Sequence, residues 1–203
     1  MNERADKRRG VTLGRVLAGV AVAAAAGAAW YYARERMTEA PDHEPIISDG
    51  VFALRRYPAL IAAAVVREGQ REPALKAGFG ALADYIFAES RAGEPIAMTV
   101  PVLLDRAGQG WRTRFIMPVA WTHETLPAPG EGVAIEDIAP RRVATIRFSG
   151  AADDALIDRK AEALRAWMAV QGLTAASHAE FAFYNSPAIP GPLRRNEVWM
   201  QVA

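Results

Sequence analysis

The amino-acid sequence predicts an α+β fold. We expect two ββαββ halves that form one distorted antiparallel β-barrel or curved sheet, flanked by two helices and preceded by a transmembrane helix. The first observation behind this prediction is an uncharged stretch near the amino terminus, residues 16–33. The second is a similarity of pattern between residues 51–120 and residues 133–202, which indicates an internal repeat. The third is the helical spacing of apolar residues in the middle of each half.

The amino-terminal region divides into three segments. Residues 1–10 are basic and are expected in the cytoplasm, and residues 11–33 are apolar apart from Arg15. About 20 apolar residues span a bilayer, so this second segment is a predicted transmembrane helix. Residues 34–50 are expected to be a linker. The alternative is a cleaved secretory signal, since the sequence AGA at residues 26–28 fits a cleavage site.

These segments predict a location. An uncleaved helix would make a single-pass protein of a bacterial inner membrane, with its carboxyl-terminal domain in the periplasm. A cleaved signal would leave a secreted or periplasmic protein instead. Either way the lipid bilayer is an expected partner of residues 11–33, directly or during export.

The predicted repeat occupies the domain over residues 51–203. An ungapped alignment of its two halves, which keeps a constant offset, places Pro58 on Pro140 and Tyr85 on Trp167. Strands are expected where apolar and β-branched residues cluster or alternate, and helices where apolar residues recur every three or four positions. The expected strands are 51–57, 60–67, 96–103 and 111–118, then 133–138, 142–148, 179–184 and 198–202. The expected helices are 73–90 and 153–171.

The strand that ends the chain is expected to be the counterpart of residues 114–119, with both central in the sheet. Residues 122–132 are rich in Pro and Gly and should join the halves as a loop. The polar run RRNE, residues 194–197, leads into the last strand. Two interpretations stay open for it: a solvated turn with ion pairs, or a structural role that fixes the last hairpin.

Composition excludes several kinds of site. The chain has 24 basic and 23 acidic residues and a formal net charge of +1, so nucleic-acid binding is not expected. Cys is absent, which excludes disulfides and thiolate metal sites. The three His stand apart without metal-ligand spacing, and Ser149 and Ser186 lack a G-x-S-x-G elbow. We therefore expect no metal site, no catalytic residue and a protein that is not an enzyme.

Short segments spread over most of the chain together resemble the SOUL haem-binding family. The resemblance covers about residues 51–202. It implies a distorted antiparallel β-barrel with two helices and an internal pseudo-twofold axis. It also implies noncovalent binding of haem or another tetrapyrrole in a shallow apolar cleft beside the first helix. The segments are IAMTVPV (96–102), FIMP (115–118), ETLPAP (124–129), RFSG (147–150), YNSP (184–187) and RRNEVW (194–199).

The resemblance also implies which residues contact the ligand. Lys76 matches a basic position placed to meet a haem propionate. Phe79 and Ala83 match apolar positions on the same helix. Trp111 falls near an apolar strand position, and Tyr184 matches a tyrosine of the cleft.

Two departures from the family pattern affect the expected site. Asp84 stands where a lysine can occur, and Arg56 stands where some members have a His proposed as axial ligand. Arginine is not a haem iron ligand, so this ligand is missing here. The leading hypothesis is a membrane-anchored module that binds a tetrapyrrole for sequestration, buffering or transfer. The alternatives are a binding module for another amphipathic small molecule, since the duplicated pattern also resembles GyrI-like effector-binding domains, and an envelope scaffold protein.

Overall fold

The computed structural model describes residue 33, residues 37–89 and residues 91–203. The chain forms two compact units, residues 1–38 and residues 39–203, and the second holds the sheet. The predicted basic segment over residues 1–10 lies outside the described residues, and so does nearly all of the predicted transmembrane helix over residues 11–33. Among the residues that are described, no helix is long and apolar enough to cross a membrane.

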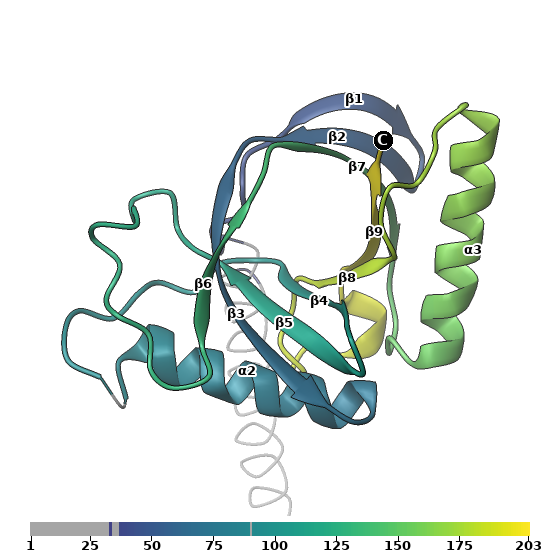
Figure 1. Cartoon of the computed structure of the whole chain (residues 1–203). Helices are drawn as coiled ribbons and strands as arrows, with labels where there is room; N and C mark the ends of the chain where they lie inside the picture. Colours follow the sequence, from purple (N-terminus) through teal and green to yellow (C-terminus); the bar gives the residue numbers. More distant parts are fainter. Residues whose placement is uncertain (1–32, 34–36, 90) are drawn as a thin grey trace, which may run out of the picture. The chain divides into compact units, whose positions relative to one another are not determined.

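The described residues form nine antiparallel strands and two α-helices (Figure 1). The strand order is β1-β2-β7-β9-β8-β4-β5-β3-β6, with β1 and β6 as the two edges. The expected antiparallel sheet with two helices is therefore confirmed, but the sheet is not closed into a barrel. The elements are β1 Glu44–Asp49, β2 Phe52–Tyr57, β3 Leu60–Glu68, α2 Arg71–Phe87, β4 Val102–Ala107, β5 Gly110–Ile116, β6 Ala134–Ile138, β7 Arg141–Phe148, α3 Asp154–Val170, β8 Glu180–Phe183, the 3₁₀ turn Gly191–Leu193 and β9 Asn196–Val202.

The strand order shows the duplication directly. Without β1, the order is unchanged when it is read backwards and each strand is exchanged for its counterpart in the other half. The pair β4–β8 lies at the centre and joins the halves. The last strand, β9, is central as predicted, since it pairs with β7 and β8 just as β5 pairs with β3 and β4.

The ungapped alignment of the halves is wrong for the strands. Ala63 lies opposite Phe115 in the first half, and Ala144 lies opposite Met200 in the second. All four side chains lie in the clusters that face the helices, so these two pairs are the true counterparts. The ungapped alignment instead places Ala63 one position beyond Ala144. Successive strand residues point to opposite faces of the sheet. The ungapped alignment therefore matches side chains that face the helices with side chains that face away from them. The halves match only when gaps are allowed.

Two segments differ from the expected elements. Glu44–Asp49, which the sequence assigned to the linker, forms β1 and pairs with β2. Residues 96–101, which were expected in a strand, form irregular chain before β4. The Ile96 N–H donates to the Ile86 carbonyl at 2.7 Å, and the Thr99 hydroxyl donates to the Ile116 carbonyl. This segment therefore packs against the end of α2 instead of extending the sheet.

The sheet has a helix-covered face and a concave face. Figure 1 shows both helices on the outside of its curve, and α2 packs on β3 and β5 whereas α3 packs on β7 and β9. The concave face carries an apolar cluster that includes Tyr57, Leu103, Ile116 and Trp199. Side chains on this face alternate along each strand with those under the helices, so each strand contributes to both interiors.

Candidate functional site

The outer surface of α2 carries exposed phenylalanines. The helix buries Ala74, Gly78, Leu82, Tyr85 and Ile86 against the sheet. On its other side Phe79 and Phe87 are 41% and 49% exposed. Residues three or four positions apart lie on one side of a helix. Lys76, Phe79, Ala83 and Phe87 follow this spacing, and we call them the α2 outer stripe.

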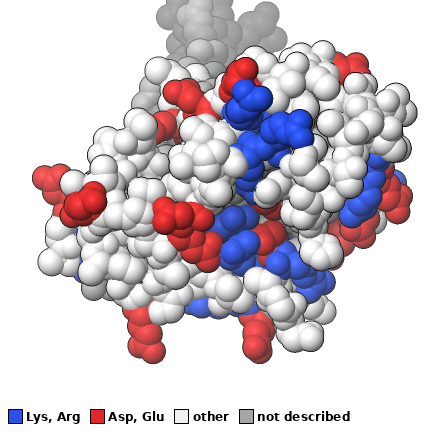
Figure 2. Space-filling view, turned by 45° about the horizontal axis from the view of Figure 1, so that its top comes forward, with Lys and Arg blue, Asp and Glu red and all other residues white. Residues whose placement is uncertain are grey.

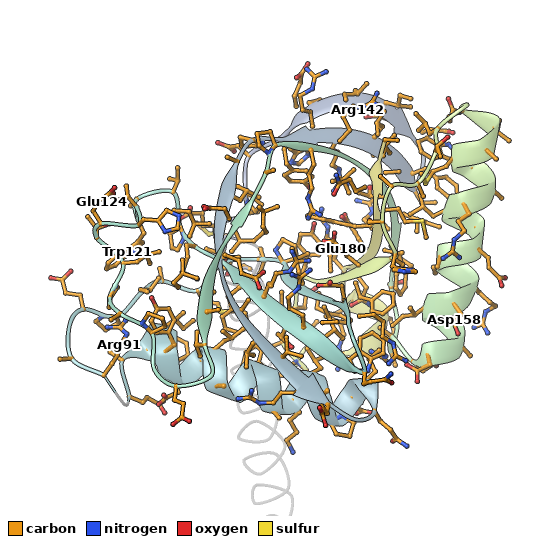
Figure 3. The ribbon with its side chains drawn as sticks, viewed as in Figure 1. Arg91, Trp121, Glu124, Arg142, Asp158 and Glu180 are labelled. Atoms are coloured by element: carbon orange, nitrogen blue, oxygen red, sulfur yellow. The ribbon has the colours of Figure 1, made fainter. Side chains whose placement is uncertain are left out.

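The symmetry-related helix α3 has a different outer surface. Its exposed residues include both signs of charge, and Asp158 points away from the sheet in Figure 3. Charged side chains are the usual covering of a helix face in water. The apolar stripe is therefore a property of α2 and not of the fold. The exposed charged residues of α3 are Asp154, Asp158, Arg159, Glu162 and Arg165.

Phe79 is partly exposed, and its ring packs against the sheet. Its ring lies edge-on to Phe115 of β5, with ring centroids 5.1 Å apart and an interplanar angle of 67°. Lys76 is exposed one turn earlier, and Ala83 is half-buried one turn later. Three of the five predicted ligand-contacting residues therefore lie together on one helix surface.

Trp111 and Tyr184 lie elsewhere. Trp111 is buried on the helix side of β5, beside Phe181 at 6.0 Å between ring centroids. Tyr184 is buried on the concave side, and its hydroxyl donates to Glu197 at 3.0 Å. The structure does not bring these two aromatic residues into one cleft with the α2 outer stripe.

Two of the described histidines contact residues outside α2. His43 lies beside the Tyr57 ring, and burial together with the charge of Arg55 lowers its pKa. His123 is within hydrogen-bond distance of Asp137, at 2.7 Å. In the part of the chain that the structure describes, no three His, Cys, Asp or Glu side chains are placed to hold a metal ion. The α2 outer stripe itself holds no His, Met or Tyr that could ligate haem iron.

Glu197 is a buried residue whose environment could not be read from the sequence alone. Its side chain is 0% exposed and accepts hydrogen bonds from Arg55, Arg195, Tyr184 and Trp199. The closest contacts are 2.7 Å from Arg195 Nη2, 2.7 Å from Trp199 Nε1 and 2.8 Å from Arg55 Nη1. Burial opposes ionisation, but the hydrogen bond and charge of Arg55 outweigh it, and the pKa of Glu197 falls to about 2.

This network decides between the two interpretations of the RRNE run. Glu197 is the first of three residues of β9 that point to the concave face, and both guanidinium groups reach it there. The sequence shows an acidic residue at an inward position of an apolar strand, but it does not show which residues pair with it. The run has a structural role, because the carboxylate ties β9 to β2.

The chain belongs to the SOUL heme-binding protein family, which residues 38–201 match. No curated protein matches the sequence closely enough to count as a relative. Family membership supports a haem- or tetrapyrrole-binding role at the level of the family, and it agrees with the two helices and duplicated sheet described above.

Several solved structures share this fold. The C-terminal domain of EcmrR is 11% identical with a TM-score of 0.54, over 75% of this chain and 96% of that one. EcmrR in its complex with DNA is 11% identical with a TM-score of 0.55, over 97% and 70%. A hydrolase encoded by lin2189 from Listeria innocua is 14% identical with a TM-score of 0.51, over 81% and 94%. At these identities the likeness is one of fold alone.

Proposed function

We propose that the chain binds haem or a related tetrapyrrole noncovalently on the α2 outer stripe, and that it sequesters, buffers or transfers this ligand without acting as an enzyme. The observation that carries the proposal is the exposure of Phe79 and Phe87 on a helix whose symmetry mate is covered by charge. Membership of the SOUL family supports the choice of ligand.

The stripe suits a planar macrocycle. Apolar and aromatic surface binds the face of such a ligand, and a single cation at the rim suits a propionate. An exposed ion pair contributes at most about 1 kcal/mol, so Lys76 adds little affinity. Phe79 is 41% exposed. A fully buried phenylalanine removes about 200 Å² from water. A ligand that covers the exposed part of Phe79 would therefore gain about 2 kcal/mol of binding free energy, at about 25 cal/mol per Å².

The iron atom should contribute little to affinity. The α2 outer stripe holds a lysine, an alanine and two phenylalanines, and none of these ligates haem iron. Tyr85 of the same helix is buried and donates its hydroxyl to the Pro127 carbonyl at 2.8 Å. We therefore expect hemin and metal-free protoporphyrin IX to bind with affinities within about threefold of each other, less than about 1 kcal/mol.

The experiment is a titration of the full-length chain with hemin and with protoporphyrin IX, followed by absorbance and by quenching of tryptophan fluorescence. Phe79→Ala should weaken both ligands by about ten- to thirtyfold, the equivalent of about 2 kcal/mol. Val170→Ala is the matched control, because Val170 is 84% exposed at the end of α3. Serum albumin serves as the control for nonspecific uptake.

Two results would count against the proposal. Equal saturable binding by the wild type and both variants would remove the α2 outer stripe as the site. Nonsaturating uptake of both porphyrins would remove the ligand class, and would favour another amphipathic molecule, the alternative to which the missing iron ligand already points.

We also propose that residues 11–33 anchor the chain in a bacterial inner membrane, with the carboxyl-terminal domain in the periplasm. The uncharged stretch at residues 16–33 and the basic residues before it support this. Membranes from cells that express the full-length chain would be washed at high pH, which strips peripheral proteins. Retention of the full-length mass in the membrane is expected. Release of a shortened chain would indicate a cleaved signal.

A further inference from the structure

The concave face of the sheet holds a cavity that the proposed tetrapyrrole site does not use. Its volume is about 400 Å³, within the range of small-molecule sites. Glu180 lies inside the curve of the sheet in Figure 3, and basic side chains gather in a hollow of the surface in Figure 2. Eight Asp, Glu and Arg residues of five strands line it, two of which are Arg106 and Asp137. We call the cavity formed by the other six, Asp105, Arg112, Arg114, Glu136, Arg141 and Glu180, the concave arginine cavity.

The deepest part of this cavity is built around Glu180. Arg141 donates to both Glu180 oxygens, at 2.9 Å for Nη2 to Oε2, and Arg114 Nη2 donates to Oε2 at 3.2 Å. Burial opposes ionisation of this carboxyl, but the hydrogen bond and charge of Arg141 and the charge of Arg114 lower its pKa below the usual range. The side chains of Arg114 and Arg141 are only 5% and 6% exposed.

The outer part of the cavity is more accessible. The Arg112 side chain is 31% exposed, and its Nη2 donates to Asp105 Oδ2 at 2.8 Å. Its Nη1 donates to Glu136 at the longer distance of 3.2 Å. Arg112 therefore holds Asp105 with its Nε and Nη2 atoms, and its Nη1 atom makes one longer contact with Glu136.

The cavity has more hydrogen-bond donors than acceptors. Each of the three guanidinium groups carries five N–H donors, whereas each of the three carboxylates offers about four acceptor sites. The charges of these six residues are balanced, but the donors outnumber the acceptors. The Nε atoms of Arg114 and Arg141 are buried and have no hydrogen-bond partner. A buried N–H without an acceptor is destabilising, because it has lost its hydrogen bond to water. The group that would complete this set is an acceptor, and arginine forks match planar carboxylates and phosphates.

We propose that the concave arginine cavity binds a small organic anion, whose carboxylate or phosphate oxygens accept hydrogen bonds from Arg112, Arg114 and Arg141. This site is separate from the α2 outer stripe, because Arg114 and Phe115 are neighbours on β5 and point to opposite faces of the sheet. The ligand would bind on one face of the sheet while a tetrapyrrole occupies the helix on the other.

The test is calorimetric titration of the full-length chain with succinate and with inorganic phosphate, at an ionic strength held constant with sodium chloride. At least one anion should bind saturably at one site, and the better of the two identifies the oxyanion class. Arg112→Gln should weaken it by about tenfold or more, as expected for a lost charge-assisted pair. Arg142→Gln is the matched control. Arg142 of β7 is exposed and lies outside the cavity, so this substitution removes the same charge without changing the site.

The proposal fails if neither anion binds saturably, or if Arg112→Gln and Arg142→Gln weaken binding equally. Arg112→Lys keeps the charge but loses the planar fork of the guanidinium. Its anion affinity can be measured instead if the glutamine variant does not fold. Unchanged affinity in Arg112→Lys would also overturn the proposed geometry. Phe79→Ala should leave anion binding unchanged, so failure of this site and failure of the tetrapyrrole site can be told apart.

Discussion

Replacement of Glu197 by Gln gives the sharpest test of how the concave face is held together. Arg55 and Arg56 are neighbours on β2, and each forms an ion pair on a different side of the strand. Arg55 pairs with Glu197, whose side chain is fully buried, and Arg56 pairs with Glu44, whose side chain is exposed. Glu44→Gln is therefore a control that removes the same charge from the neighbouring pair.

The structure gives the size of the effect. The pKa of Glu197 is lowered from 4.5 to about 2 by its arginine partners. At about 1.4 kcal/mol per pKa unit this contributes about 3 kcal/mol of stability. Because the folded pKa lies below the unfolded one, this stability is present above about pH 4.5 and is lost as the pH falls toward about 2. Removal of one partner from a buried pair costs about 3–5 kcal/mol, whereas an exposed pair is worth less than about 1 kcal/mol.

The assay is urea unfolding followed by tryptophan fluorescence between pH 7 and pH 2. At pH 7 we expect Glu197→Gln to lower the free energy of unfolding by about 3–5 kcal/mol and Glu44→Gln by less than about 1 kcal/mol. The difference between wild type and Glu197→Gln should shrink as the pH falls through the range given above. A loss below about 1 kcal/mol at pH 7, or a difference that does not change with pH, would refute the reasoning.

Substitutions at three further positions test the helices by thermal unfolding. A Cβ at Gly78 would lie 2.5 Å from the Thr113 Oγ1, so Gly78→Ala should destabilise the fold by about 1–3 kcal/mol. A Cβ at Gly80 would meet nothing within 4 Å, so Gly80→Ala should stabilise it by up to about 1 kcal/mol; the opposite order would contradict the packing of α2 on β5. Asp153 accepts the Leu156 N–H at 2.8 Å, so Asp153→Ala should cost about 1 kcal/mol and Asp153→Asn much less.

The two helices and most strands could be predicted because their patterns are local. The structure places α2 at Arg71–Phe87 and α3 at Asp154–Val170, close to the expected ends. β1 was missed because Glu44–Asp49 contains Pro45 and lies at the sheet edge, where it buries little. An exposed edge strand needs no alternation of apolar side chains. The sequence of this segment therefore showed neither that alternation nor an apolar run, which are the usual signals of a strand.

The repeat was recognised, but its register was not. The match of Pro58 with Pro140 aligns Tyr57 with Ala139, whereas Ile138, one position earlier, is the residue that shares the concave cluster with Tyr57. A slip of one residue changes the face of every side chain in a strand. Residue identity at a turn could not reveal this slip, because only the packing of the sheet shows which face each residue occupies.

The candidate sites differ in how far the sequence could predict them. Lys76, Phe79 and Ala83 are close in sequence, so their common helix surface followed from the resemblance and helical spacing. Arg55 and Glu197 lie far apart in the sequence, and they meet only because β7 brings β2 and β9 together. Long-range pairing of this kind has no local pattern in the chain.

The corrected register shows that one ion pair occurs twice with its charges exchanged. The alignment that matches Tyr57 with Ile138 also matches Arg55 of β2 with Glu136 of β6. The pairing of β5 and β9 with their neighbours likewise matches Arg112 with Glu197. In the pair of Arg55 with Glu197, the carboxylate belongs to the inner strand β9 and is fully buried. In the pair of Glu136 with Arg112, the guanidinium belongs to the inner strand β5 and its side chain is 31% exposed.

This exchange bears on the cavity described above, which is lined by Arg112 and Glu136. A central carboxylate can accept from both arginines, so its site is complete, whereas a central guanidinium retains spare donors. Glu136→Gln should therefore cost less than about 1 kcal/mol in a urea titration, because its pair with Arg112 is partly exposed and 3.2 Å long. The same variant should strengthen succinate or phosphate binding severalfold in calorimetry, since it removes a carboxylate that competes for Arg112. Weaker anion binding by Glu136→Gln would mean that the guanidinium is held in place by Glu136 and not occupied by it.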